Sequence, residues 1–175
     1  MQWYETVFEL IDLRSFSNLW YWIALAVLWS SASHYVLGVP FDLVIRAKRA
    51  GGQAQEDLEI LVRVNVHRLV YIAEASGLWL LGFVSAILTM LAMLGFYYGI
   101  ELCQAIFLLF LPMTILGGLS LRLAFRLQAE NPMGDALRKR LTRHRFWIQG
   151  LGIISIFFTA MWGMWQNMNL GPLGA

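Results

Sequence analysis

Cysteine and charge are both scarce in this 175-residue sequence. Its one cysteine, Cys103, excludes an intrachain disulfide framework and any zinc or iron–sulfur site built from several cysteines. Only 14% of the residues are charged, against about 25% in a typical soluble domain. The three histidines, His34, His67 and His144, lie on separate segments without the helical spacing of a metal site. The sequence therefore predicts no metal site and no cofactor.

Apolar residues are abundant instead. They make up 59% of the chain, against roughly 45–50% in soluble domains, and the mean hydropathy is +0.61. A single small domain cannot bury this much apolar surface, so lipid must cover part of it. A helix needs about 20 apolar residues to cross a bilayer, and four windows qualify: 18–38, 77–98, 102–122 and 146–166. The sequence predicts a single-domain, all-α membrane protein with four transmembrane helices in a bundle.

Basic residues predict the orientation of these spans. Twelve of the thirteen Lys and Arg residues lie between the first two windows, in 41–76, or after the third, at Arg122 and in 123–145. By the positive-inside rule, both segments are cytoplasmic and both termini lie outside. Because the basic residues flank the spans, we expect no nucleic-acid partner. The N-terminal stretch MQWYETVFELIDLR lacks the basic region of a cleavable signal peptide, and we expect it to lie on the outer interface.

The two cytoplasmic segments carry helical patterns. Residues 55–76 place apolar side chains near one helical face and lead into the second window. The run FDLVIRAKRA predicts another helix, ended by Gly51 and Gly52. Together they predict a cytoplasmic helical hairpin between the first two spans, with Arg63, Asn65 and His67 as candidate functional side chains. Residues 134–145 are basic and amphipathic, which indicates a surface helix attracted to anionic lipids.

Polar side chains recur near the cytoplasmic ends of the four spans. His34 lies near the end of the first window, Glu74 precedes the second, Arg122 ends the third and Gln149 opens the fourth. Ionisable groups at this depth often face the bundle interior and pair with one another. A histidine beside a carboxylate would suit proton transfer or pH sensing. The alternative is that these side chains reach water from the helix ends at little cost.

Small residues recur at four-residue spacing within the windows. Such stripes let helices approach closely in lipid, so they predict a packing seam within the bundle or between copies of the chain. The members of this seam are Ala26, Ser30, Gly82, Ala86, Thr114, Gly118, Ser155, Thr159 and Gly163.

Three stretches carry a resemblance to a known group: WYETVFELIDLRSFSNLWYW, SSASHYVLGVPFDLVIRAKRAGG and TAMWGMWQN. The chain resembles small bacterial four-span inner-membrane proteins of unknown function, some of which are loosely labelled as a component of an iron–sulfur cluster assembly (Suf) complex. The resemblance covers nearly the whole chain and includes no catalytic motif. It implies a multi-pass protein of the bacterial inner membrane.

A weaker likeness points to the membrane-associated eicosanoid and glutathione metabolism proteins. These are also small four-span proteins, and their second helix contacts glutathione through Arg, Asn and Glu. The likeness implies that Arg63, Asn65 and Glu74, which lie in the matching helix, would contact that ligand.

The leading hypothesis is a non-enzymatic inner-membrane subunit that acts as an accessory or assembly component. The small-residue stripes and the hairpin motivate it, and the lack of a catalytic constellation permits it. Its partners would be the lipid bilayer and other membrane subunits, or further copies of the chain. Two alternatives stay open: a homo-oligomeric channel or transporter lined by the polar layer, and a glutathione-type membrane enzyme.

Overall fold

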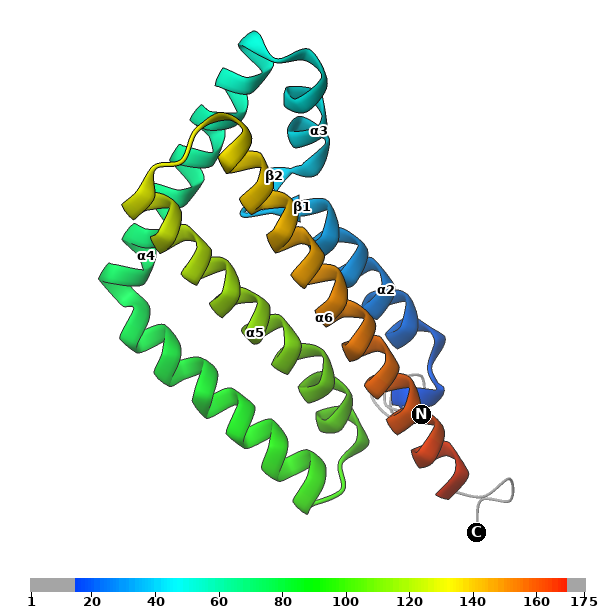
Figure 1. Ribbon diagram of the computed structural model, residues 1–175. Coiled ribbons are helices and arrows are strands. Elements are labelled where there is room, and N and C mark those ends of the chain that lie inside the picture. The colour runs from blue at the N-terminus through cyan, green and yellow to red at the C-terminus, as the bar shows by residue number, and fades with distance from the viewer. Residues whose placement is uncertain (1–14, 170–175) are drawn as a thin grey trace, which may run out of the picture.

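The computed structural model describes residues 15–169, and nearly all of them are helical (Figure 1). A 3-10 turn, η1 (Ser15–Ser17), precedes α2 (Leu19–His34), and the short strands β1 (Tyr35–Val36) and β2 (Val39–Pro40) lead into α3 (Phe41–Ala50). Helix α4 (Gly52–Ala92) continues into the π-helical turn η2 (Met93–Tyr97) and is followed by α5 (Glu101–Glu130) and α6 (Gly134–Asn169). The expectation for the N-terminal stretch MQWYETVFELIDLR falls outside the described residues.

The long helices alternate in direction. In Figure 1, α2 and α5 run toward the end of the molecule that carries α3, whereas α4 and α6 run away from it. Both ends of the described chain therefore lie at the opposite end from α3. Helix α4 packs along α5, α5 along α6, and α6 along α2.

Three helices are long and apolar enough to cross a membrane: Gly52–Tyr97, Glu101–Glu130 and Gly134–Met168. They indicate a multi-pass membrane protein and contain the last three predicted windows almost entirely. Helix α2 has 16 residues and is about 24 Å long, whereas a membrane-spanning helix has roughly 17–25 residues. The first predicted span is therefore shorter than expected.

The first predicted window, 18–38, also ends differently. The helix stops at His34, and a tight hairpin follows in which Leu37 and Gly38 have φ angles of 53° and 73°. Two nearby residues explain the stop. Glycine adopts positive φ easily, and Pro40 disfavours helical backbone at the residue before it. Val36 and Val39 are fully buried, so this hairpin belongs to the core rather than to a longer helix.

The core is concentrated at the α3 end of the molecule. Helix α4 carries four buried residues at four-residue spacing: Leu58, Val62, Val66 and Val70. They pack in one cluster with residues of the β1–β2 hairpin, α3, α5 and α6. Leu58 and Val62 belong to the apolar face that the sequence of 55–76 predicts, whereas Ile72, also expected on that face, is 43% exposed. Helices α3 and α4 are separated at Gly51, where φ is 59°, and pack against each other as the expected helical pair.

Helices α5 and α6 are both longer than the sequence predicts. Helix α5 continues to Glu130, beyond the predicted window 102–122. Residues 134–145 do not form a separate surface helix, because α6 runs without a break from Gly134 to Asn169. Pro112 is buried within α5, and the helix continues on both sides of it.

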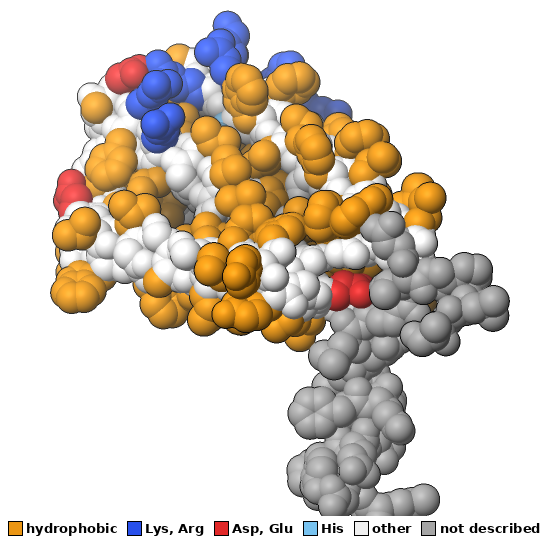
Figure 2. All heavy atoms as spheres, turned by 90° about the horizontal axis from the view of Figure 1, so that it is seen from below, with side chains coloured by type: hydrophobic (Ala, Val, Ile, Leu, Met, Phe, Trp, Pro, Cys, Tyr) orange, Lys and Arg blue, Asp and Glu red, His pale blue; other side chains and the backbone are white. Residues whose placement is uncertain are grey.

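Hydrophobic side chains cover much of the molecular surface. Figure 2, seen from below, shows them over most of the visible face, with Lys and Arg gathered along one edge. The most exposed include Leu78 and Trp79, each 83% exposed on α4, and Ile153, 70% exposed on α6. Apolar surface of this kind matches a protein solvated by lipid.

Candidate functional site

The four residues of the predicted polar layer lie on four different helices. His34 ends α2, Glu74 lies on α4, Arg122 on α5 and Gln149 on α6, and all four side chains are exposed. Within residues 15–169, no hydrogen bond or ion pair joins any two of them. His34 instead lies edge-on to the ring of Tyr35, with centroids 5.0 Å apart. The structure therefore contains no direct His–carboxylate contact in this layer, and its function stays a prediction.

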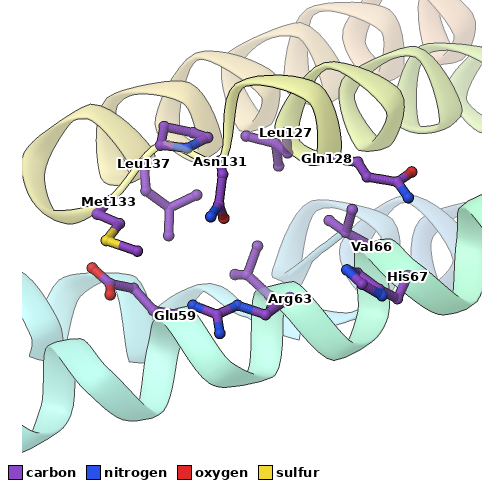
Figure 3. A pocket seen from close by; sticks show the side chains of 11 residues that line it. Glu59, Arg63, Val66, His67, Leu127, Gln128, Asn131, Met133 and Leu137 are labelled. Atoms are coloured by element: carbon purple, nitrogen blue, oxygen red, sulfur yellow. The ribbon is translucent and has the colours of Figure 1, made fainter.

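A small pocket lies where α4 meets the turn between α5 and α6 (Figure 3). Its volume is about 220 Å³, and its polar lining consists of Glu59, Arg63, His67, Gln128 and Asn131. In Figure 3, the first three side chains rise from α4, and Asn131 points toward them from the opposite wall. Apolar residues complete the lining, some buried in the core, such as Val62 and Leu127, and one, Met133, 56% exposed. Arg63 and His67, two of the three candidate side chains of the predicted helical hairpin, thus line one pocket.

Glu59 has the best-defined contacts in this pocket. Its Oε1 accepts hydrogen bonds from the backbone N–H of Gly134 and from Gln55 Nε2, both at 2.7 Å. These two hydrogen bonds, first that from Gly134, hold the pKa of Glu59 below its usual value of 4.5. The side-chain oxygen of Gln55 accepts from Arg138 in turn. Glu59 therefore joins α4 to the first turn of α6, on the part of α4 that precedes the expected membrane window 77–98.

The lining of the pocket offers several groups that can bind a ligand. Its lining contains no Ser, Cys or Lys nucleophile, and its one carboxylate is already engaged by two donors. In the described part of the chain, no group of three or more His, Cys, Asp and Glu side chains is placed to hold a metal ion. What remains is a small cavity with one permanent cation, Arg63, and several hydrogen-bonding groups.

Asn65 does not share this pocket. It follows Arg63 by two residues, which on a helix is a rotation of about 200°. It lies instead beside the turn of the β1–β2 hairpin, where a Cβ on Gly38 would stand 3.4 Å from Asn65 Nδ2. Glu74 is exposed and lies outside the pocket lining. Arg63, Asn65 and Glu74 do not converge, so their arrangement gives the glutathione-type alternative no support.

The α6 part of the small-residue seam is buried inside the chain. Ser155, Thr159 and Gly163 are all buried, and a Cβ on Gly163 would stand 3.2 Å from Phe16 Cδ1 and 3.3 Å from Trp22 Cζ2. These small residues let η1 and α2 approach α6 closely.

The other members of the seam face outward or lie half-buried. Ala26, Ser30, Gly82, Ala86 and Gly118 are exposed, and no atom lies within 4 Å of a Cβ built on Gly82 or Gly118. Thr114 is half-buried, and its hydroxyl donates to the carbonyl of Leu111 at 2.7 Å. The exposed members are therefore available to a neighbouring chain or to lipid.

A buried polar cluster at the opposite end of the molecule was missed by sequence reasoning. Gln104 is 4% exposed; its Nε2 donates to the carbonyl of Gly95 at 2.8 Å, and its Oε1 accepts from Trp162 Nε1 at 2.9 Å and Gln166 Nε2 at 2.5 Å. The cluster joins η2, α5 and α6. A single amide side chain within an apolar window was the available signal, because a polar group buried in lipid or protein needs partners.

Comparison with protein-family models, with curated proteins and with solved structures finds no match for this chain.

Proposed function

We propose that this chain is a non-enzymatic integral membrane subunit, an accessory or assembly component that acts by contact with other membrane proteins. The observation that carries the proposal is the outward face of α4. Only 6% of its most apolar 18-residue window is buried, against 22% in α5 and 28% in α6. This window is therefore the least buried within its own chain of the three.

Small residues on this face favour a helix as its partner. Gly82 and Ala86 lie one turn apart, and both are exposed. Lipid is as apolar as leucine, so helices associate in a bilayer through close packing, which small side chains permit. Bulky exposed neighbours such as Leu78 and Phe83 flank the pair and would form the walls of such a contact.

The proposal includes four membrane crossings, with both termini outside, in the inner membrane of a bacterium. It is supported by the alternating helix directions, which put α3 and the α5–α6 turn at one end and both ends of the described chain at the other (Figure 1). Most Lys and Arg residues lie on segments at the α3 end. The shortness of α2 is tolerable because Val36, Leu37 and Val39 of the β1–β2 hairpin that extends it are buried in protein, and the two strands pair their own backbone.

The chemistry of the pocket is consistent with a non-enzymatic role. The lining offers binding groups but no nucleophile, and the polar layer offers no paired acid and base. The resemblance to small four-span inner-membrane proteins agrees with the proposed membrane placement.

Site-specific photo-crosslinking in intact cells tests the proposal. A photoreactive residue at Ala86 is expected to capture a distinct membrane protein, whereas one at Ile153, exposed on α6, serves as the matched lipid-facing control. The proposal is wrong if both positions give the same products or lipid adducts alone. An adduct between two copies of this chain would support the homo-oligomeric alternative instead.

A further inference from the structure

A second, larger groove runs between the end of α5 and the beginning of α6. Its volume is about 640 Å³. Five cationic side chains line it: Arg122, Arg126, Lys139, Arg140 and Arg143. The groove also contains one carboxylate, Glu130, so its lining carries an excess of positive charge.

Among the described residues, three of these cations have no carboxylate partner. Arg140 forms an ion pair with Glu130, and Lys139 pairs with Asp135 at 2.8 Å. No ion pair within residues 15–169 involves Arg122, Arg126 or Arg143. Arg122 and Arg126 lie one turn apart on α5, and Arg143 lines the same groove from α6. The unneutralised charge therefore comes from both walls of the groove.

The two helices are held together beside these arginines. Ser120 Oγ on α5 and His144 Nε2 on α6 lie 3.1 Å apart, within hydrogen-bonding distance. His144 is buried, whereas the arginines are exposed. The cationic side chains thus project from two helices that are in direct contact at Ser120 and His144.

The end of the groove nearer the middle of both helices is apolar. Leu119 lines it on α5 and Trp147 lines it on α6, whereas Leu123 lies between Arg122 and Arg126. Trp147 is 61% exposed, at the edge of the membrane window 146–166, and tryptophan is enriched at membrane–water interfaces. A ligand that fills the groove must meet cations at one end and apolar side chains at the other.

We infer that this groove binds the headgroup of an anionic phospholipid, an assignment that rests on the membrane placement proposed above. The phosphate lies at Arg122, Arg126 and Arg143, and the start of an acyl chain lies along Leu119 and Trp147. Guanidinium groups bind phosphate oxygens through two parallel hydrogen bonds. A zwitterionic headgroup is disfavoured because its own cation would lie among the arginines. A soluble phosphate would leave the apolar end of the groove unfilled.

Native mass spectrometry of the full-length protein in neutral detergent tests this site. The delipidated protein is titrated with phosphatidylglycerol, with phosphatidylcholine of the same chains, and with glycerol 3-phosphate. We expect phosphatidylglycerol alone to be retained. Each arginine removed is expected to weaken its binding roughly fivefold, so a variant combining Arg122→Gln, Arg126→Gln and Arg143→Gln weakens it about 100-fold.

A matched control removes the same charge elsewhere. Arg46→Gln, Lys48→Gln and Arg49→Gln alter three exposed cations of α3 that lie outside the groove, and together they should weaken binding less than about threefold. Equal loss in both triple variants overturns the inference. So does equal binding of phosphatidylcholine, or of glycerol 3-phosphate, which would indicate a soluble phosphate ligand.

Circular dichroism checks that the groove variant is folded. If it is not, the three single Arg→Gln variants replace it, and each should lose roughly fivefold in affinity. Unchanged affinity in all three would overturn the inference. This experiment is independent of the crosslink at Ala86: lipid retention with no protein adduct contradicts the subunit proposal alone, and the reverse result contradicts the lipid site alone.

Discussion

Trp29 of α2 lies directly against the backbone of Gly152 on α6. A Cβ at position 152 would stand 2.9 Å from Trp29 Cε3, closer than real Cβ contacts, and 3.3 Å from Cδ2, tighter than most of them. Trp29 is 5% exposed, so its ring has little space into which to move. The pair therefore sets how closely α2 approaches α6.

Replacing this glycine by alanine should weaken the fold. We expect Gly152→Ala to destabilise the protein by about 1–3 kcal/mol, the usual cost of overpacking. Gly150→Ala is the control, because no atom lies within 4 Å of a Cβ at that position. Alanine is the better helix former by about 0.5–1 kcal/mol, so the control should be neutral or stabilising. Thermal unfolding in detergent, followed by circular dichroism, measures both; equal midpoints would contradict the close contact.

Removing the amide of Gln104 should be costly. Gln104→Leu leaves the carbonyl of Gly95 and the indole N–H of Trp162 without their partner, and we expect a loss of about 1–3 kcal/mol. Gln149→Leu makes the same chemical change at an exposed position and should have little effect. The same unfolding assay compares the two variants. A Gln104→Leu protein as stable as the Gln149→Leu protein would mean that the buried cluster is not stabilising.

The contribution of Glu59 should depend on pH. Because its pKa in the folded protein lies below 4.5, ionised Glu59 stabilises the fold above the pKa of the unfolded chain. This contribution is lost as the pH falls through the lower folded value. We expect Glu59→Gln to lower the unfolding midpoint at pH 7, and the difference from the unmodified protein to shrink as the pH is taken below 4.5.

Glu56→Gln provides the control for this pH series. Glu56 is exposed on the same turn of α4 and makes no hydrogen bond within the described residues. Its variant should follow the pH profile of the unmodified protein. A constant difference between Glu59→Gln and the unmodified protein at every pH would show that the Gly134 contact does not depend on the charge.

Cysteine labelling should distinguish the two ends of the molecule. In a Cys103→Ser background, Gln53→Cys lies at the start of α4 and Met168→Cys near the end of α6, and both side chains are exposed. We expect a membrane-impermeant maleimide to label Met168→Cys in intact spheroplasts, and Gln53→Cys only after permeabilisation. The opposite pattern would contradict the orientation derived from the basic residues.

The long helices could be predicted from the sequence because their apolar windows exceed the length of a bilayer crossing. The fusion of 55–76 with the second span was also predictable, since its apolar spacing continues without a glycine–proline break. The end of α2 was not predicted, although Gly38 and Pro40 carried the signal. Their effect is local, whereas the apolar window 18–38 continues to Gly38 and ends before Pro40.

The directions of the side chains in the predicted polar layer could not be derived from the sequence. Position along a span estimates the depth of His34, Glu74, Arg122 and Gln149, but not the direction in which each points about its helix axis. That direction depends on which neighbour each helix packs against, and the structure leaves all four exposed. The same limit explains why Arg63 and His67 meet in a pocket that their spacing on one helix could not reveal alone.

Helix α4 extends over 41 residues, or about 60 Å, with no break between its membrane half and the hairpin. It acts as a lever: a tilt of the exposed segment around Gly82 must displace the far end, where Glu59 holds Gly134. A protein that packs against α4 within the bilayer and tilts it would therefore shift the Glu59–Gly134 contact at the start of α6.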